Sequence, residues 1–153
     1  MMKLYISFKS GYTVIELLVI VALNILVAGF IFTGFVNYSN EQRFNTTVSE
    51  IKSHFKETRQ KTTAAETNSQ FGIYFATSSL IVFEGPSYSN TKLENVIYRY
   101  PDFSISPQLS ASTSAVVFAR LTGKPSATGT IMISNSRSGS VRNLVITNSG
   151  LIE

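Results

Sequence analysis

The side chains able to do chemistry in this 153-residue chain fall in two places. Near the N-terminus a single acid, Glu16, stands inside an otherwise apolar run. An acid in such a run calls for a partner of opposite charge. Toward the C-terminus, basic residues in Ser/Gly-rich segments favour contacts to phosphate groups. These four candidates are Arg120, Lys124, Arg137 and Arg142, and the only acid that follows them is Glu153.

Signatures of catalysis and of metal binding are missing from the sequence. The absence of Cys excludes disulfides and thiolate chemistry. Neither G-x-S-x-G nor H-E-x-x-H occurs, and "LTGKPS" lacks the upstream glycine of a phosphate-binding loop. The one histidine, His54, sits beside Ile51 and Phe55, where a structural role is expected. We therefore predict that the protein is no enzyme and holds neither metal nor cofactor.

The apolar run from Val14 to Val36 has the length of a membrane span. Its 23 residues would form a helix of about 35 Å, enough to cross a hydrocarbon core of about 30 Å. Lys3 and Lys9 precede it, so the positive-inside rule keeps the N-terminus cytoplasmic. The run is longer than the core of an ordinary secretory signal and lacks a small-residue cleavage site behind it. Inside it, Asn24 bonds either a neighbouring helix or its own backbone.

A helix followed by short strands is predicted for the rest of the chain. Phe44, Val48, Ile51 and Phe55 recur at spacings of 4, 3 and 4, so one helix over residues 12–67 carries an apolar stripe. Pro101 and Pro107 bracket a stretch expected to be irregular. Alternating patterns predict strands at 71–77, 79–84, 95–100, 114–120, 129–134 and 141–147. The expected fold class is α+β, with an antiparallel sheet covering the helix stripe.

The N-terminal pattern resembles the type IV pilin family, which comprises type IV pilins, minor pilins and type II secretion pseudopilins. Their precursors carry a short basic leader that ends in Gly before an apolar helix, with Glu fifth after the cut. Here Gly11 matches the residue before the cut, Tyr12 the new N-terminus and Glu16 the fifth residue. Two departures are Tyr12, where the family usually has Phe, and the missing Pro in "IFTGFV".

The resemblance implies a processing and assembly pathway. A prepilin peptidase would cut between Gly11 and Tyr12, the freed amine would normally undergo N-methylation, and Glu16 would pair with the amine of a neighbouring subunit. The implied parts are a leader (1–11), a transmembrane and assembly segment (12–36), the second half of the helix (37–67) and a pilin-like β-rich head (68–153). The implied partners are the peptidase, other pilin or pseudopilin subunits, an inner-membrane assembly platform and, before assembly, membrane lipid. The precursor would cross the inner (cytoplasmic) membrane once with its head outside the cytoplasm. It would then enter a pilus or a periplasmic filament, or reach the cell surface.

The C-terminal half narrows the resemblance. The strand and glycine spacing of "ARLTGKPSATGTIMIS", "VRNLVIT" and "SGLIE" is similar to that of FimT-type minor pilins and GspH-type pseudopilins. This similarity implies a structural minor subunit of a type IV pilus or a type II secretion-like filament. One alternative is a DNA-binding minor pilin for uptake in competence, in which the four basic residues contact DNA, although the chain ends "GLIE" where Arg would help. Another is a signal-anchored surface domain that never polymerises.

Overall fold

The computed structural model describes residues 12–153, with only the backbone of Thr33. The expected leader, including Gly11, lies outside the described residues. The chain divides between Ser39 and Asn40 into two compact units, of which the second is the head, residues 40–153. Each unit is described by itself.

A single α-helix, α1 (Val14–Thr63), spans most of the segment predicted to be helical. It begins behind Thr13, whose side-chain oxygen accepts a hydrogen bond from the backbone N–H of Glu16 at 3.3 Å, as at a helix N-cap. It ends four residues before the predicted boundary because Ala65 adopts the left-handed conformation, which stops an α-helix. A short 3₁₀ helix, η1 (Glu66–Asn68), follows.

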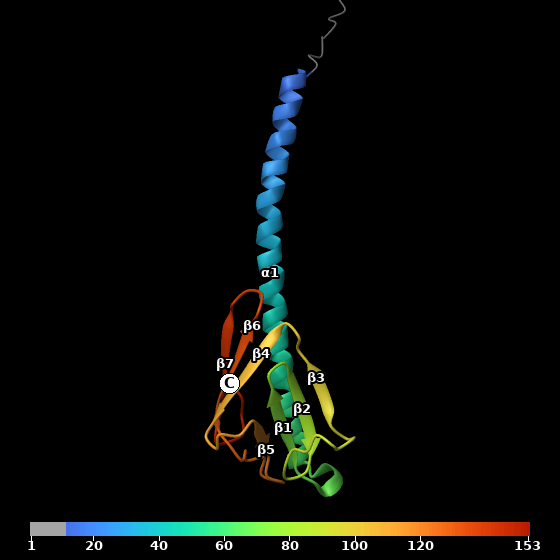
Figure 1. The fold of residues 1–153 in the computed structure, drawn as a ribbon, viewed down its shortest axis with the longest axis vertical. Helices are drawn as coiled ribbons and strands as arrows, with labels where there is room; N and C mark the ends of the chain where they lie inside the picture. Colours follow the sequence, from blue (N-terminus) through green and yellow to red (C-terminus); the bar gives the residue numbers. More distant parts are fainter. Residues whose placement is uncertain (1–11) are drawn as a thin grey trace, which may run out of the picture. The chain divides into compact units, whose positions relative to one another are not determined.

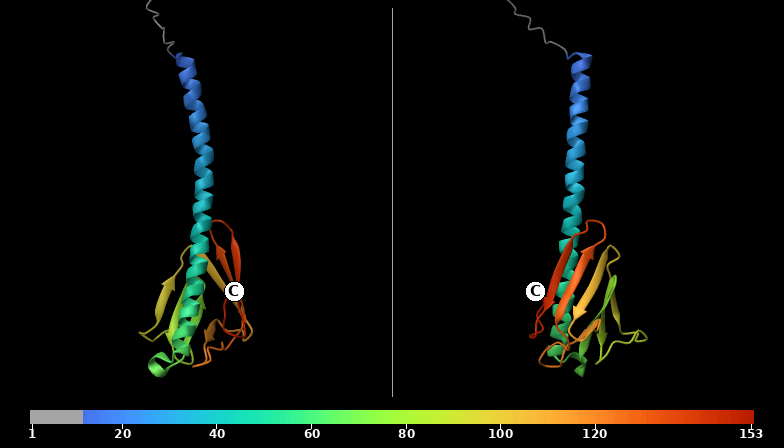
Figure 2. Two further views of the ribbon diagram at one scale, coloured as in Figure 1. Left: turned by 180° about the vertical axis from the view of Figure 1, so that it is seen from behind. Right: turned by 60° about the vertical axis from the view of Figure 1, so that its left-hand side comes forward.

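The described part of the head contains seven strands in two antiparallel sheets (Figure 1). The larger sheet has the order β3 (Val96–Arg99), β2 (Ser79–Glu84), β1 (Phe71–Ala76) and β5 (Ala115–Val117). The smaller sheet has the order β4 (Phe103–Leu109), β6 (Gly129–Asn135) and β7 (Val141–Ile146). The α+β class is therefore confirmed, whereas the expectation of one sheet is wrong. Two views of the head show both sheets beside the part of α1 that belongs to it (Figure 2).

Strand β4 is the element that the sequence reading missed. Pro107 suggested irregular chain, yet it pairs with Ile131 of β6 in a regular ladder. The N–H of Ile105 donates to the carbonyl of Thr77 at 2.7 Å, on the side of β4 that faces away from β6. Because N–H groups alternate in direction along a strand, the nitrogen of Pro107 also lies on that outer side. An edge strand tolerates proline there, since no ladder bond is lost.

The predicted apolar stripe of α1 forms the centre of the core. Phe44, Ile51 and Phe55 are fully buried, and Val48 is partly buried against them. Each buried ring or aliphatic side chain contributes about 1.5–3 kcal/mol of transfer free energy. The ring of Phe55 meets Phe118 edge-on with centroids 4.9 Å apart. The strands complete this core with residues that include Ile73, Phe75, Leu80, Ile105, Val116, Ile131, Ile133, Leu144 and Ile146.

Two threonines extend the stripe to the end of α1. Thr58 and Thr62 are buried, and each hydroxyl donates to the carbonyl four residues earlier in the helix. The Oγ1 of Thr62 also accepts a hydrogen bond from the N–H of Phe71 at 3.2 Å. The hydroxyls are therefore buried with their hydrogen bonds made, and Thr62 ties the helix to the first strand.

Candidate functional site

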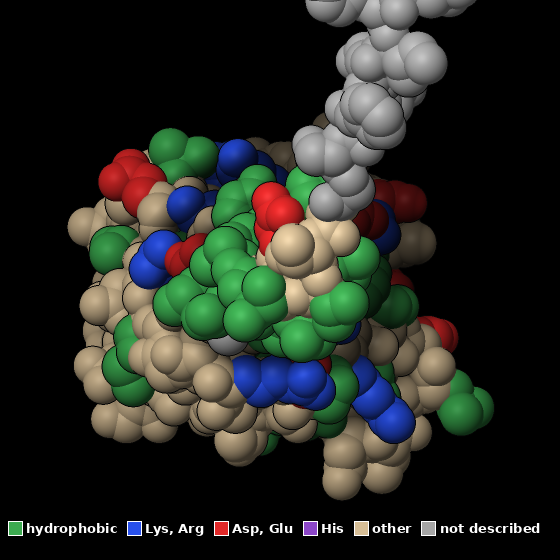
Figure 3. Space-filling view, turned by 90° about the horizontal axis from the view of Figure 1, so that it is seen from above, with side chains coloured by type: hydrophobic (Ala, Val, Ile, Leu, Met, Phe, Trp, Pro, Cys, Tyr) green, Lys and Arg blue, Asp and Glu red, His purple; other side chains and the backbone are tan. Residues whose placement is uncertain are grey.

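The first candidate site is the apolar segment of α1. From Val14 to Val36 every side chain with a described placement is exposed, and Phe30 keeps 75% of its surface. Within residues 12–153, α1 is the one helix long and apolar enough to cross a membrane by length and composition. Seen from above in Figure 3, hydrophobic side chains gather around the helix end. An apolar surface of this size requires lipid or protein to cover it.

Glu16 occupies the first turn of this apolar segment. Its backbone N–H is bonded to Thr13, whereas no side chain among residues 12–153 bonds its carboxylate. The N-terminal end of a helix carries a partial positive charge, which favours a carboxylate there. Tyr12, the predicted new N-terminus, lies just before the helix and is 75% exposed. The carboxylate of Glu16 is therefore available to a partner outside the described residues.

Asn24 lies in the middle of the same segment and bonds its own helix. Its Nδ2 donates to the carbonyl oxygen of Ile20 at 2.7 Å. Of the two alternatives raised by the sequence, the structure shows the bond to the backbone. Helix α1 continues through Gly29 and Gly34, near the place where pilins often carry Pro, without interruption.

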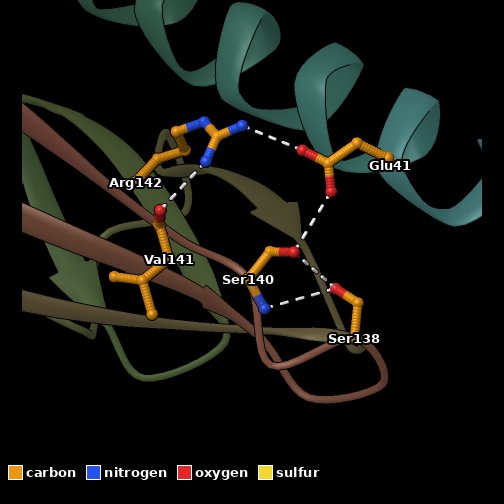
Figure 4. Close-up of polar contacts among 5 residues, drawn as sticks. All are labelled: Glu41, Ser138, Ser140, Val141 and Arg142. Carbon is orange, nitrogen blue, oxygen red and sulfur yellow. Dashed lines mark hydrogen bonds and ion pairs between the residues drawn. The ribbon is translucent and has the colours of Figure 1, made fainter.

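Two of the four basic candidates are engaged in ion pairs. Arg137, in the turn between β6 and β7, donates from Nε and Nη2 to Oδ1 of Asp102 at 3.2 and 3.0 Å. Arg142, on β7, donates from Nη2 to Oε1 of Glu41 at 2.8 Å, and Ser140 donates to the other oxygen of Glu41 at 3.1 Å (Figure 4). The guanidinium carbon of Arg142 also lies 5.6 Å from the ring centroid of Phe44. Both arginines therefore make partly exposed ion pairs within the head.

The other two basic candidates lie at the opposite end of the smaller sheet. Arg120 and Lys124 precede β6, whereas Arg137 and Arg142 follow it. Arg142 stands opposite Ile133, near the far end of β6. The side chains of Arg120 and Lys124 have no bonded partner within the described residues. The structure therefore brings the four residues together only as two separate pairs.

Arg59, near the end of α1, is a structural residue that sequence analysis did not single out. Its Nε donates to the carbonyl oxygen of Gly123 at 3.3 Å, and its Nη2 donates to that of Ser149 at 3.1 Å. These carbonyls are 64 and 90 positions away in the chain. No local pattern signals such a contact, because backbone carbonyls are present at every residue. Arg59 joins α1 to two turns at one end of the head.

The only histidine has the structural surroundings that were expected. The ring of His54 stacks on Tyr98 with centroids 3.6 Å apart, and its Nδ1 lies 3.7 Å from Oε2 of Glu57. A hydrogen bond from Lys61 lowers the pKa of the Glu57 carboxyl, and the same bond raises the pKa of the Lys61 ammonium. Among residues 12–153, no three His, Asp or Glu side chains are grouped so that they could hold a metal ion.

A groove of about 700 Å³ lies beside β1 and β5. The stacked rings of Tyr74 and Tyr88, 4.2 Å apart, form part of its lining, and Lys124 is the one charged side chain in it. Because no acid or histidine is among the described lining residues, these residues provide no acid–base pair with Lys124.

Comparisons with protein-family models, with curated proteins and with solved structures found no match to this chain. The fold and the site define the protein in physical terms. It has an N-terminal helix with an exposed apolar segment, long enough to span a membrane, and a head of two antiparallel sheets.

Proposed function

We propose that the protein is a filament subunit of the type IV pilin kind, a minor pilin or pseudopilin matured by a prepilin peptidase. The observation that carries the proposal is Glu16, a carboxylate without a partner in the described chain, at the start of an exposed apolar helix. The amine of a neighbouring subunit, freed at Tyr12, would supply the missing positive charge when helices bundle. An ion pair inside an apolar bundle fixes register because a slipped neighbour leaves both charges unpaired.

The proposed pathway explains the exposed apolar surface in two stages. Membrane lipid covers residues 14–36 before assembly, with the head outside the cytoplasm. Neighbouring helices replace the lipid in the filament, so the same surface serves first as an anchor and then as an assembly interface.

Two simpler roles for Glu16 lead to different experimental results. As an acid in the first turn it would stabilise the helix through the dipole by about 0.3–1 kcal/mol. As part of a signal anchor that never polymerises, it would only need to reach water at the membrane surface. In both cases the leader need not be removed, and the charge of residue 16 would have no effect on association between chains.

Mass spectrometry of the N-terminus tests the processing step. The full chain is produced together with a prepilin peptidase, and the mature protein should begin at Tyr12 with an added methyl group. Tyr12→Phe is the matched control, because it restores the ring that the family usually carries and should be processed equally well. An intact leader on the membrane-inserted protein would refute the proposal.

Incorporation into filaments tests the role of the charge. Glu16→Gln keeps the size and hydrogen-bonding capacity of the side chain but removes the charge, and should strongly reduce incorporation. Glu50→Gln, an exposed acid further along the same helix, is the control and should assemble normally. Normal assembly of Glu16→Gln would leave only the helix-dipole role.

DNA uptake is not part of this proposal. Arg137 and Arg142 are bonded to acids, and the remaining two basic residues lie at the other end of the smaller sheet. DNA binding through Arg120, Lys124, Arg137 and Arg142 stays a prediction. It requires salt-sensitive binding of duplex DNA that weakens when these residues are replaced by Ala.

A further inference from the structure

The two sheets of the head expose four edge strands, and the chain itself closes three of them over at least part of their length. Edge strands carry unpaired backbone groups that can pair with another chain unless something blocks them. Here neighbouring segments of the same chain take up these groups. The closing contacts are Val117 with Ser126 on β5, Ile105 with Thr77 on β4, and Val145 with Glu153 on β7.

Strand β3 is the edge strand that stays open along its whole length. The N–H of Tyr100 donates to the carbonyl of Ser78, on the side of β2. Backbone N–H and C=O groups of successive residues point to alternate sides of a strand, so those of Ile97 and Arg99 point away from β2. No residue of the described chain bonds them. In both figures β3 lies at the margin of the head, with β2 as its neighbour (Figures 1 and 2).

The open edge is also apolar. Val96 and Ile97 keep about half of their surface exposed, at 48% and 50%, and Leu93 in the preceding turn is fully exposed. Natural edges are usually protected by charged side chains, proline or a bulge, and over Val96–Arg99 strand β3 has only the charge of Arg99 at its end. Its surroundings therefore favour an added strand rather than water.

We propose that β3 pairs with β3 of a second copy of this chain, antiparallel, about a twofold axis at Ile97. The outward groups of Ile97 would exchange two hydrogen bonds with Ile97 of the second copy, and Asn95 would stand opposite Arg99. On the other face Val96 would meet Tyr98. This register sets apolar side chains against each other at the centre, and no like charges stand opposite. The two Arg99 side chains would be four positions apart, about 13 Å at about 3.3 Å per residue.

The occupant is a second copy because, with Ile97 on the twofold axis, apolar residues stand opposite each other at the centre and Arg99 faces an uncharged residue. A twofold contact closes on itself and cannot extend a filament. It therefore links subunits in pairs, and it is independent of the helix contacts that the proposed function requires. Anchoring in one membrane raises the local concentration of heads, so a short edge is sufficient.

Cysteine cross-linking in the full membrane-inserted chain tests the contact, since the chain contains no native Cys. The two Cα atoms of a hydrogen-bonded antiparallel pair lie about 5.5 Å apart, within the range of about 4.4–6.8 Å that a disulfide allows. Ile97→Cys should therefore form a disulfide-linked dimer when diamide is added as oxidant. Arg99→Cys tests the register, because in this pairing residue 99 of one copy is too far from residue 99 of the other for a disulfide to form. Val145→Cys is the general control, with a similar exposure of 44% on an edge that the chain itself closes.

A dimer several-fold more abundant for Ile97→Cys than for the two other variants supports the contact. Equal cross-linking of all three variants would show mere proximity in the membrane and would overturn it. No dimer for Ile97→Cys, or a cross-link to a different protein, would also overturn it. A double variant, Asn95→Cys with Arg99→Cys, should also cross-link, because these two positions stand opposite each other in the proposed register. Adding Ile97→Pro to it removes one outward N–H and should abolish this cross-link. A leader cut at Gly11 is measured separately, so failure of one idea leaves the other standing.

Discussion

Replacing Tyr100 by Phe should make the head more stable, although it removes a polar group. Tyr100 is 7% exposed, and its hydroxyl is buried with no hydrogen-bond partner among the described residues. A buried unpaired hydroxyl costs about 1–3 kcal/mol. Phe keeps the ring and its packing, so Tyr100→Phe should raise the free energy of unfolding by about 1 kcal/mol at pH 7.

The advantage of Phe should grow at alkaline pH. Burial raises the pKa of Tyr100 from its ordinary value to about 12, and the charge of Glu50 adds to the effect. In the unfolded chain a tyrosine ionises near pH 10. A raised pKa therefore contributes stability that is fully present below about pH 10 and is lost as the pH rises toward 12. At pH 10.5 the loss for the parent is about 0.8 kcal/mol, whereas the Phe variant loses nothing from this position.

Urea unfolding of the head, residues 40–153, measures both effects. The head has its own core, and the assay compares the parent and Tyr100→Phe at pH 7 and pH 10.5. Tyr98→Phe, two residues earlier on β3, is the matched control, because its ring stacks on His54 and is only partly buried. The reasoning is refuted if Tyr100→Phe destabilises the head by more than about 0.5 kcal/mol at pH 7, or if its advantage does not grow at pH 10.5.

Three further substitutions test the contacts that build the head. Thr62→Val should lower the free energy of unfolding, measured with urea, by about 1–3 kcal/mol, because a backbone N–H at the start of β1 loses its acceptor. Thr63→Val is the control and should change this free energy by no more than about 0.5 kcal/mol, because its hydroxyl bonds only within its own turn. Gly129→Ala should prevent accumulation of folded head, judged by circular dichroism, because the added Cβ would overlap a backbone carbonyl of β4 at a φ of 148°. Gly139→Ala, where the space is open, should cost only about 1–2 kcal/mol for its φ of 69°. Arg142→Ala should cost less than about 1 kcal/mol, and added salt should shrink the difference, because both partners of its ion pair are partly exposed.

Each of these predictions has an outcome that contradicts it. Equal effects at the two threonines would mean that the bond to β1 does not matter. A normally folded Gly129→Ala head would contradict the close approach of β4 and β6. A salt-independent loss of several kcal/mol in Arg142→Ala would point to packing of its guanidinium on Phe44 as the larger contribution.

The local pattern of apolar and polar residues predicted most helices and strands of the head. It failed where a strand is possible only because of the strand beside which it lies. The stripe of Phe44, Ile51 and Phe55 follows helical periodicity, so it was visible without tertiary information. Strand β2 was predicted with its observed bounds because its alternating pattern is local. Strand β4 was missed because Pro107 is tolerable only on an outer edge, and the identity of the edge depends on which strands pair.

The sequence by itself determined an exposed apolar helix, a buried stripe and a set of short strands, because these depend on residue type and period alone. Only the tertiary structure showed which partners two of the basic residues have. Arg137 and Arg142 pair with acids 35 and 101 positions away, which no local pattern reveals. Only the pairing of strands decided which edge stays open, because every residue type other than proline offers the same backbone N–H and C=O groups at an edge. Glu16 stands between these cases: its place in the helix follows from the sequence, and no residue of the described chain bonds its carboxylate.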